Sequence, residues 1–363
     1  MFLALRDLRR AWRRFTLVGL VVALVALLST VLTGLADGLV TDGISGLRAL
    51  PFTHLALSEG SQAVFSRSTL HDEELRRWDS VDGVEASPLG VSFVNAAGTG
   101  GRLNLDLALF GVTSDSFLVE RPEARAALAG EPGLVLSSEI EAEGVEVGDT
   151  YDLGGSGVRL PVLGFTYAGS YGHVPIAFVS LDEWREITYG TDARGRFSAI
   201  AIDSERGGDL EALAGPGIDL KTKTAAYAGS PGYSAETATM TLIRGFLLVI
   251  SALIVGAFFT VLTVQRTRQI GLLKALGAST GYILRDGIGQ IAMVVVAATA
   301  AGVLVGAVVT GLLEGEGSVP IEMAPRSIAG TTALLVVTGI AGSLAALRRI
   351  SRVEPAIALG VEP

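Results

Sequence analysis

Side chains that could carry catalytic or metal chemistry are few in this chain. It has no cysteine, which excludes disulfides, thiolate metal sites and cysteine nucleophiles. Neighbouring carboxylates such as Glu139 and Glu141 lie on stretches typical of a solvent-facing surface, whereas a glycosidase needs two acids across a cleft. The nucleophile elbow, the zinc-protease helix motif and the nucleotide-binding P-loop are absent from the sequence. Three histidines are too scattered for a recognisable metal site: His54, His71 and His173. We therefore predict no catalytic residue and no metal ligand.

One spacing brings two charges and a methionine together. Glu236, Met240 and Arg244 follow one another at intervals of four, so a helix places all three on one face. They lie at the start of an apolar run. The sequence favours the interpretation that Glu236 and Arg244 are membrane-interface charges that extend toward water.

The stretch QIGLLKALGAST (Gln269–Thr280) has the pattern of a short amphipathic helix. Lys274 could meet acidic residues, Gly277 predicts the end of the helix, and Ser279 or Thr280 can cap the next one. The apolar residues recur at helical spacing and form a stripe that could enter a groove: Ile270, Leu273 and Leu276. An element without a catalytic group must act by contact, either with a partner protein or with lipid headgroups.

These residues are positioned by elements that the composition assigns to a membrane. The 363 residues are 49% hydrophobic and only 6% aromatic, with 46 glycines, as is typical of helices that pack through small residues in lipid. A span needs roughly 20 apolar residues, and four segments qualify: 15–37, 239–264, 285–313 and 327–347. The first run is too long for the apolar core of a signal peptide, so we expect an anchor.

Charge sets the expected orientation of these spans. Residues 1–14 carry five arginines against one aspartate, whereas residues 37–244 carry 15 basic and 30 acidic residues. We therefore predict a multi-pass protein of the cytoplasmic (inner or plasma) membrane with both termini in the cytoplasm. The predicted cytoplasmic parts are an amphipathic helix, a loop and a tail: 1–14, 265–284 and 348–363. The predicted extracytoplasmic parts are a large domain and a short loop: 38–238 and 314–326.

The large domain should be of the α+β class. The run RLNLDLALFGV (102–112) alternates leucines with more polar residues and predicts a half-buried strand. HDEELRRW (71–78) predicts a short helix with acids early and arginines late. Further strand and helix patterns occupy three segments: 133–153, 175–187 and 197–202.

Two pairs of small residues, spaced four apart, lie in the predicted spans. Gly302 and Gly306 are in the third, and Ala252 and Gly256 in the second. Such spacing lets two helix backbones approach closely. The contact can lie within one chain or between two copies, and the sequence leaves both open.

This layout and two motifs resemble the MacB/FtsX/LolE permeases of ABC transporters. QRTRQIGLLKALGAST (265–280) is similar to that family's cytoplasmic loop, and RISRVEPAIAL (349–359) to its closing segment. Within the family, FTHLALSEGSQAVFSRSTL (52–70) and SPGYSAETATMTLIRGFLLVISA (230–252) resemble the DevC/HrtB branch. The resemblance implies four transmembrane helices and an extracytoplasmic α+β domain of the MacB core-domain type.

The resemblance also implies partners. A coupling helix would dock into a separate cytosolic ABC ATPase subunit, present in two copies, which binds ATP and Mg²⁺; its residues would be Ile270, Gly271, Leu273, Lys274, Leu276, Gly277 and Ser279. The chain would pair with a second copy of itself and contact membrane lipids, but not nucleic acid. No covalent cofactor is expected. Haem could be a substrate, although the first predicted span has no methionine that could ligate it. The candidate lateral substrate site would then be the face of Glu236, Met240 and Arg244.

The expected function is that of a non-catalytic permease subunit. It would use mechanotransmission to export or extract an apolar or amphipathic membrane-associated substrate, such as haem or a glycolipid. Two alternatives remain open. An FtsX-like regulator would switch an extracytoplasmic hydrolase without transport, and a membrane sensor would need no ATPase.

Overall fold

The structure is a computed structural model that describes residues 12–78, 81–190, 194–204, 210–265, 271–272, 276–315 and 320–348. The chain divides into two compact units. One comprises Met1–Leu39 and Thr237–Pro363, and we call it the helical unit; the other is Val40–Glu236, and we call it the α/β unit. Most of the predicted segments 1–14 and 348–363 lies outside the described residues.

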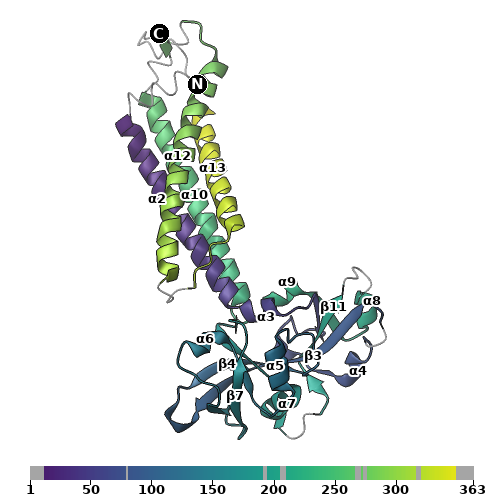
Figure 1. Ribbon diagram of the computed structural model, residues 1–363. Helices are drawn as coiled ribbons and strands as arrows, with labels where there is room; N and C mark the ends of the chain where they lie inside the picture. The colour runs from purple at the N-terminus through teal and green to yellow at the C-terminus, as the bar shows by residue number, and fades with distance from the viewer. Residues whose placement is uncertain are drawn as a thin grey trace. The chain divides into compact units, whose positions relative to one another are not determined.

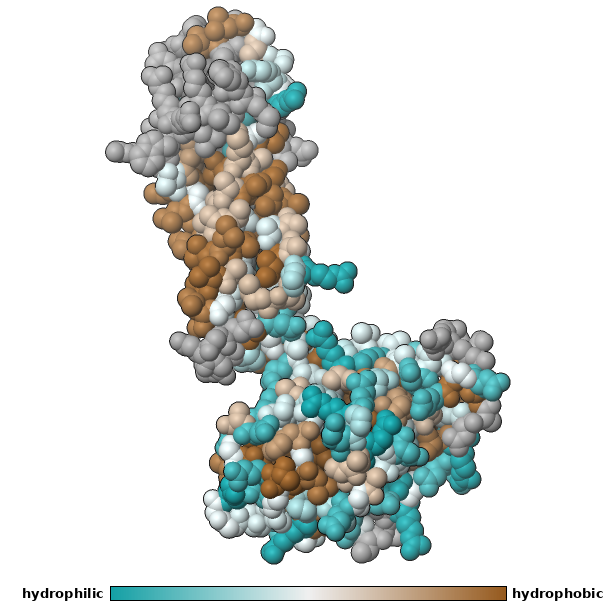
Figure 2. Space-filling model, in the orientation of Figure 1, coloured by the Kyte–Doolittle hydropathy of each residue, from teal (hydrophilic) through white to brown (hydrophobic). Residues whose placement is uncertain are grey.

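Four long helices lie side by side in the helical unit (Figure 1): α2 (Trp12–Asp42), α10 (Tyr233–Gln265), α12 (Thr280–Gly315) and α13 (Pro325–Arg348). Their common core joins Phe15 and Val18 of α2 to Val255 of α10 and Val295 of α12. Many large apolar side chains point outward instead, and brown covers most of the visible bundle surface in Figure 2. A bundle that is apolar inside and outside is expected in lipid rather than water.

Three described helices are long and apolar enough to cross a membrane: Phe15–Asp42, Tyr233–Phe258 and Arg285–Leu313. Two of them extend the predicted spans, since α2 continues to Asp42 and α10 begins at Tyr233. The fourth predicted span, 327–347, falls within α13 but is not among the three. The count of four therefore stays a prediction.

Both pairs of small residues form close helix contacts within the chain. A Cβ atom on Gly302 would clash with the carbonyl oxygen of Ala23, so α12 approaches the backbone of α2 at this point. Likewise, a Cβ on Gly256 would lie 2.9 Å from the carbonyl oxygen of Gly342 in α13. Intrachain packing therefore accounts for both motifs.

The α/β unit is built on a ten-stranded sheet in the order β12-β1-β11-β3-β4-β9-β5-β7-β6, with β8 paired to β9. The described strands of this sheet are β1 (His54–Ser58), β3 (Val84–Gly98), β4 (Leu105–Val112), β5 (Leu134–Leu136), β6 (Thr150–Leu153), β7 (Arg159–Phe165), β8 (Ser170–Tyr171), β9 (Val174–Ser180), β11 (Ala199–Ser204) and β12 (Ile218–Thr222). β3 is long enough to pair first with β11 and then, at Ala96–Gly98, with β6. This second pairing closes β3, β4, β9, β5, β7 and β6 into a ring. A separate pair is formed by β2 (Leu70–His71) and β10 (Arg196–Phe197).

Strand β4 is buried on both faces. Leu105, Leu107 and Leu109 enter one hydrophobic cluster, and Ala108 and Phe110 enter another. The prediction of a half-buried strand was therefore wrong, because layers cover both sides of the ring. The strand also begins later than the predicted run does, because Leu103 precedes β4 and is 55% exposed.

The short helices are α3 (Ser45–Ala49), α4 (Asp72–Leu75), α5 (Pro122–Leu128), α6 (Ser138–Glu141), α7 (Leu181–Tyr189), α8 (Leu210–Ala214) and α9 (Lys223–Ala226). The predicted helix in 71–78 and the strand-then-helix pattern in 175–187 are confirmed by α4, β9 and α7. Ser180 caps α7 by accepting a hydrogen bond from the Glu183 amide. Trp184 of α7 packs over Gly90 and Gly111, where no side chain intervenes.

Candidate functional site

An ion pair joins two helices in the helical unit. Arg244 of α10 donates from Nη2 to Asp37 Oδ1 of α2 at 2.9 Å and to the carbonyl oxygen of Thr33 at 3.2 Å. Asp37 Oδ2 and Arg244 Nε are buried and have no hydrogen-bond partner among the described residues. The pair therefore holds α2 against α10 and keeps one donor and one acceptor unused.

This arginine is one of the residues that line a groove of about 560 Å³. Ser29 of α2, Leu247 and Leu248 of α10, and a series of small and apolar residues of α13 line it. Within the described part of the chain, Ser29 Oγ is buried without a partner. A mostly apolar groove with a few polar side chains suits an amphipathic molecule, because such a ligand has both kinds of surface.

The predicted lateral site, Glu236, Met240 and Arg244, is divided in the structure. Glu236 belongs to the α/β unit and contacts His173, whereas Arg244 pairs with Asp37 in the helical unit. Met240 is half-buried on the same helix. Of the three, Arg244 is the residue that lines the groove.

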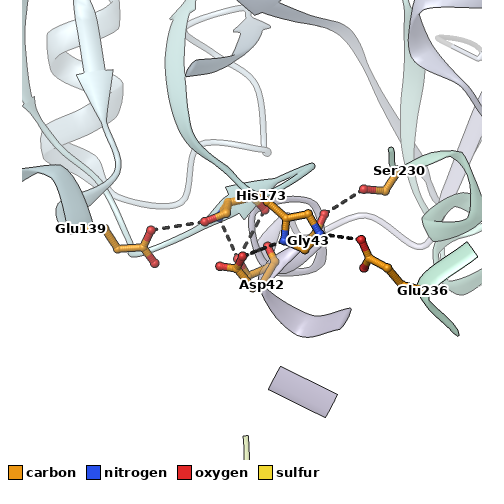
Figure 3. Close-up of polar contacts among 8 residues, drawn as sticks. Asp42, Gly43, Glu139, His173, Ser230 and Glu236 are labelled. Atoms are coloured by element: carbon orange, nitrogen blue, oxygen red, sulfur yellow. Dashed lines mark hydrogen bonds and ion pairs between the residues drawn. The ribbon is translucent and has the colours of Figure 1, made fainter. Parts of the chain in front are cut away.

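His173 lies between two carboxylates in the α/β unit (Figure 3). Its Nδ1 is 2.9 Å from Oδ2 of Asp42, and its Nε2 is 3.0 Å from Oε1 of Glu236. Asp42 is the last residue of α2, and Glu236 lies in the first turn of α10. Sequence reasoning missed this site because the three residues are far apart in the chain, and one histidine without a spacing motif gives no signal.

The geometry favours a charged imidazole ring. A neutral imidazole has one donor nitrogen and one acceptor nitrogen, so it can donate to one of the carboxylates but not to both. Partial burial would lower the pKa of His173, but the hydrogen bonds and charges of Asp42 and Glu236 outweigh it and raise the pKa above its ordinary value. The described residues hold no set of three or more His, Asp or Glu side chains suited to a metal ion, so we interpret the cluster as an ion pair.

Polar contacts extend from the cluster. Ser170 donates to Oε2 of Glu139 at 3.3 Å, and its own amide donates to Ser45 Oγ at 2.8 Å. Burial raises the pKa of Glu139, and the charge of Asp42 adds to this effect, while the Ser170 hydrogen bond opposes it. The Glu139 carboxylate of α6 therefore interacts electrostatically with Asp42, one of the carboxylates around His173.

The described part of the predicted coupling stretch forms a helical end followed by a capped helix. The Leu276 amide donates to the Leu272 carbonyl oxygen at 3.0 Å, and Gly277 then has φ +93°. Ser279 Oγ accepts from the Tyr282 amide at 3.2 Å, which caps α12. Both the helix end and the cap were predicted.

The remaining coupling residues are only partly described. Gly271 is buried, and Leu276 is 78% exposed. Ile270, Leu273 and Lys274 lie outside the described residues. The docking role of the stretch stays a prediction.

Comparisons with known proteins point to one class. Residues 241–355 match the family described as FtsX-like permease C-terminal. A protein of Staphylococcus haemolyticus (strain JCSC1435), named as the permease protein HrtB of a hemin transport system, is 22% identical over 363 residues, covering 99% of both chains. The uncharacterized ABC transporter permease Rv2563 of Mycobacterium tuberculosis (strain ATCC 25618 / H37Rv) is 24% identical over 364 residues, again 99% of both chains.

Among solved structures, the periplasmic region of MacB from Actinobacillus actinomycetemcomitans aligns with 51% of this chain and 94% of its own length. The identity is 11% and the TM-score 0.34, which is too low to support an argument. Over its full length the chain is similar to permease proteins of ABC transporters, and residues 241–355 match the FtsX-like permease domain, so these comparisons support an FtsX-type ABC permease. The likeness to permeases and the three long apolar helices indicate a membrane protein, and the ABC permease family implies a partner ATPase subunit.

Proposed function

We propose that this permease couples ATP hydrolysis in a separate cytosolic subunit to the movement of an apolar or amphipathic, membrane-derived substrate. The groove lined by Arg244 carries this proposal, because its lining is mostly apolar and includes a few polar side chains and one charge. A molecule extracted from a bilayer needs such a surface, since its acyl or ring system loses lipid contacts when it moves.

The mechanism we propose is mechanotransmission. Two copies of the chain pair, and each engages one ATPase subunit at the loop around residues 270–279. Closure of the ATPases on nucleotide pushes this loop, and α2 and α10 carry the motion to the α/β unit. This requires the loop and both termini to be cytoplasmic and the α/β unit to be outside, as the excess of arginine in residues 1–14 and of acids in residues 37–244 supports.

Hemin is the first substrate to test, because the relatives named HrtB carry hemin transport in their names. It is a flat apolar ring with two carboxylates, and Arg244 could meet one of them. A glycolipid of the cell envelope is the second, since it has the same division into apolar and polar parts.

The test uses the permease reconstituted in liposomes with its ATPase. ATPase activity is titrated with hemin and, separately, with glycolipid. Gly330→Leu should place a bulky side chain at the groove, because an added Cβ at this lining residue meets nothing within 4 Å. We expect the half-maximal ligand concentration to rise about tenfold or more, the effect of losing roughly 1.4 kcal/mol of binding free energy.

Gly311→Leu is the matched control, because a Cβ at Gly311 in α12 also meets nothing within 4 Å but lies outside the groove lining. It should respond to ligand like the wild type. Equal ligand responses in both variants would remove the groove as the site. A coupled ATPase that no amphiphile stimulates would contradict transport and favour the FtsX-like regulator.

A further inference from the structure

The turn that carries His173 does not itself require a histidine. Tyr171 of β8 pairs with Val174 of β9, which leaves a two-residue hairpin loop of Gly172 and His173. Both loop residues have positive φ, +61° and +64°. Turns of this kind prefer glycine, asparagine and aspartate, because other side chains are strained at positive φ. The contacts of the imidazole explain a histidine here better than the backbone does.

Those contacts join residues at the beginning and the end of the α/β unit. Asp42 and Glu236 lie 131 and 63 residues from His173, and each belongs to a helix that continues into the helical unit. The backbone beside them is also joined. The carbonyl oxygen of Gly43 accepts from the Gly172 amide at 2.9 Å and from the Ser230 hydroxyl at 2.8 Å. The hairpin loop is therefore the point at which the end of α2 and the start of α10 are held.

We propose that protonated His173 is a positioning residue that ties the end of α2 to the start of α10, and that loss of its proton loosens this tie. The imidazolium donates one hydrogen bond to each carboxylate. After deprotonation one ring nitrogen becomes an acceptor, and its lone pair faces a carboxylate oxygen. One carboxylate then loses its hydrogen bond, and both carboxylates lose their charge attraction to the ring.

The charges around the ring set the direction of the pH response. Asp42 and Glu236 face His173 from α2 and α10, and both stabilise the imidazolium. Glu139 of α6 approaches from the side of Ser170 and lies within the field of Asp42, and Glu143 acts on Glu139. Because the pKa of His173 is raised in the folded chain, the tie is complete below about pH 6.5. It is lost as the pH rises through the raised value.

This tie is a property of the chain itself and can be measured whatever the substrate is. The protein has no cysteine, so Thr41→Cys with Ala235→Cys would supply the only two sites for spin labels. These positions adjoin Asp42 and Glu236 in the α/β unit. Distances between the labels would be recorded by pulsed electron resonance on the full-length permease in liposomes, at several values between about pH 5.5 and 8.5, the range in which histidine titrates.

We expect a short, narrow distance at acidic pH and a longer, broader one at alkaline pH. Because one proton is exchanged, the ratio of the short-distance to the long-distance population should change by up to about tenfold per pH unit. His173→Asn should abolish the pH response, because asparagine tolerates the positive φ of the turn but does not titrate. The double variant His54→Asn/His71→Asn is the control and should keep the response, since it leaves His173 as the one histidine of the chain.

A functional readout separates a positioning role from simple packing. The pH profile of the coupled ATPase should flatten in His173→Asn, and Glu236→Gln should move the midpoint of the wild-type profile to lower pH because one stabilising charge is lost. A distance that does not change with pH in the wild type, or that changes equally in His173→Asn, would overturn the tie. A response in distance with an unaltered ATPase profile would overturn the positioning role, and neither result bears on the groove.

Discussion

A single arginine and a single aspartate set the polar contact between α2 and α10. The Arg244 side chain is 33% exposed and that of Asp37 is 19% exposed, so neither charge is fully solvated. Such a pair adds little net stability relative to an apolar pair of similar volume, but removing one partner leaves the other charge uncompensated. The pair therefore determines which parts of α2 and α10 lie against each other, and it adds little to the stability of that contact.

Arg244→Leu should lower the free energy of unfolding by about 1–3 kcal/mol, less than for a fully buried pair because water reaches the arginine. Adding Asp37→Leu to this variant should recover most of the loss. Thermal unfolding of the full chain in detergent measures both. If the costs of the two single variants simply add in the double variant, the side chains do not act as a pair.

At the scale of the helices, glycine decides how closely α12 approaches α2. Gly302 faces the backbone at Ala23, and Gly306 lies near Thr30, whose Cβ would be 2.9 Å from an added methyl group. Any side chain at these positions must separate the helices, and close backbone packing is a main source of association in lipid.

Gly302→Ala should therefore destabilise the helical unit by about 1–3 kcal/mol, the usual cost of overpacking. Gly289→Ala in the same helix is the matched control, because an added Cβ there meets nothing within 4 Å. It should be neutral or stabilising by up to about 1 kcal/mol through helix propensity. Unfolding midpoints in detergent compare the two; equal midpoints would show that the contact with Ala23 is not kept in the folded protein.

The sequence pattern predicted where helices begin and end better than it predicted burial and tertiary contacts. The helix end at Gly277 and the cap at Ser279 depend on neighbouring residues, and both could be read from the sequence. Both faces of β4 are buried because segments distant in the sequence cover them. The alternation of leucines in this strand had suggested that one face is exposed to solvent. The contact of His173 with Asp42 and Glu236 depends on how β8, α2 and α10 meet, and no spacing rule reports that.

For the whole molecule, the open question is whether the coupling stretch transmits force to and from an ATPase. Leu276 is 78% exposed beside Leu272, which is 55% exposed. Two exposed leucines four residues apart form an apolar surface that a partner helix groove can cover. Lipid headgroups could cover the same surface, but they would not couple it to nucleotide hydrolysis.

Leu276→Asp should reduce the permease-dependent ATPase activity of the reconstituted complex about tenfold or more, because burying an unpaired carboxylate at a contact costs well over 1.4 kcal/mol. Leu103→Asp is the control, since this leucine is 55% exposed in the α/β unit and outside any predicted contact with the ATPase. It should leave the activity unchanged. Pull-down of the ATPase with each variant separates loss of binding from loss of transmission. Normal binding and activity in Leu276→Asp would mean that the stretch lies on lipid, and a membrane sensor without an ATPase would then explain the chain better than a transporter subunit.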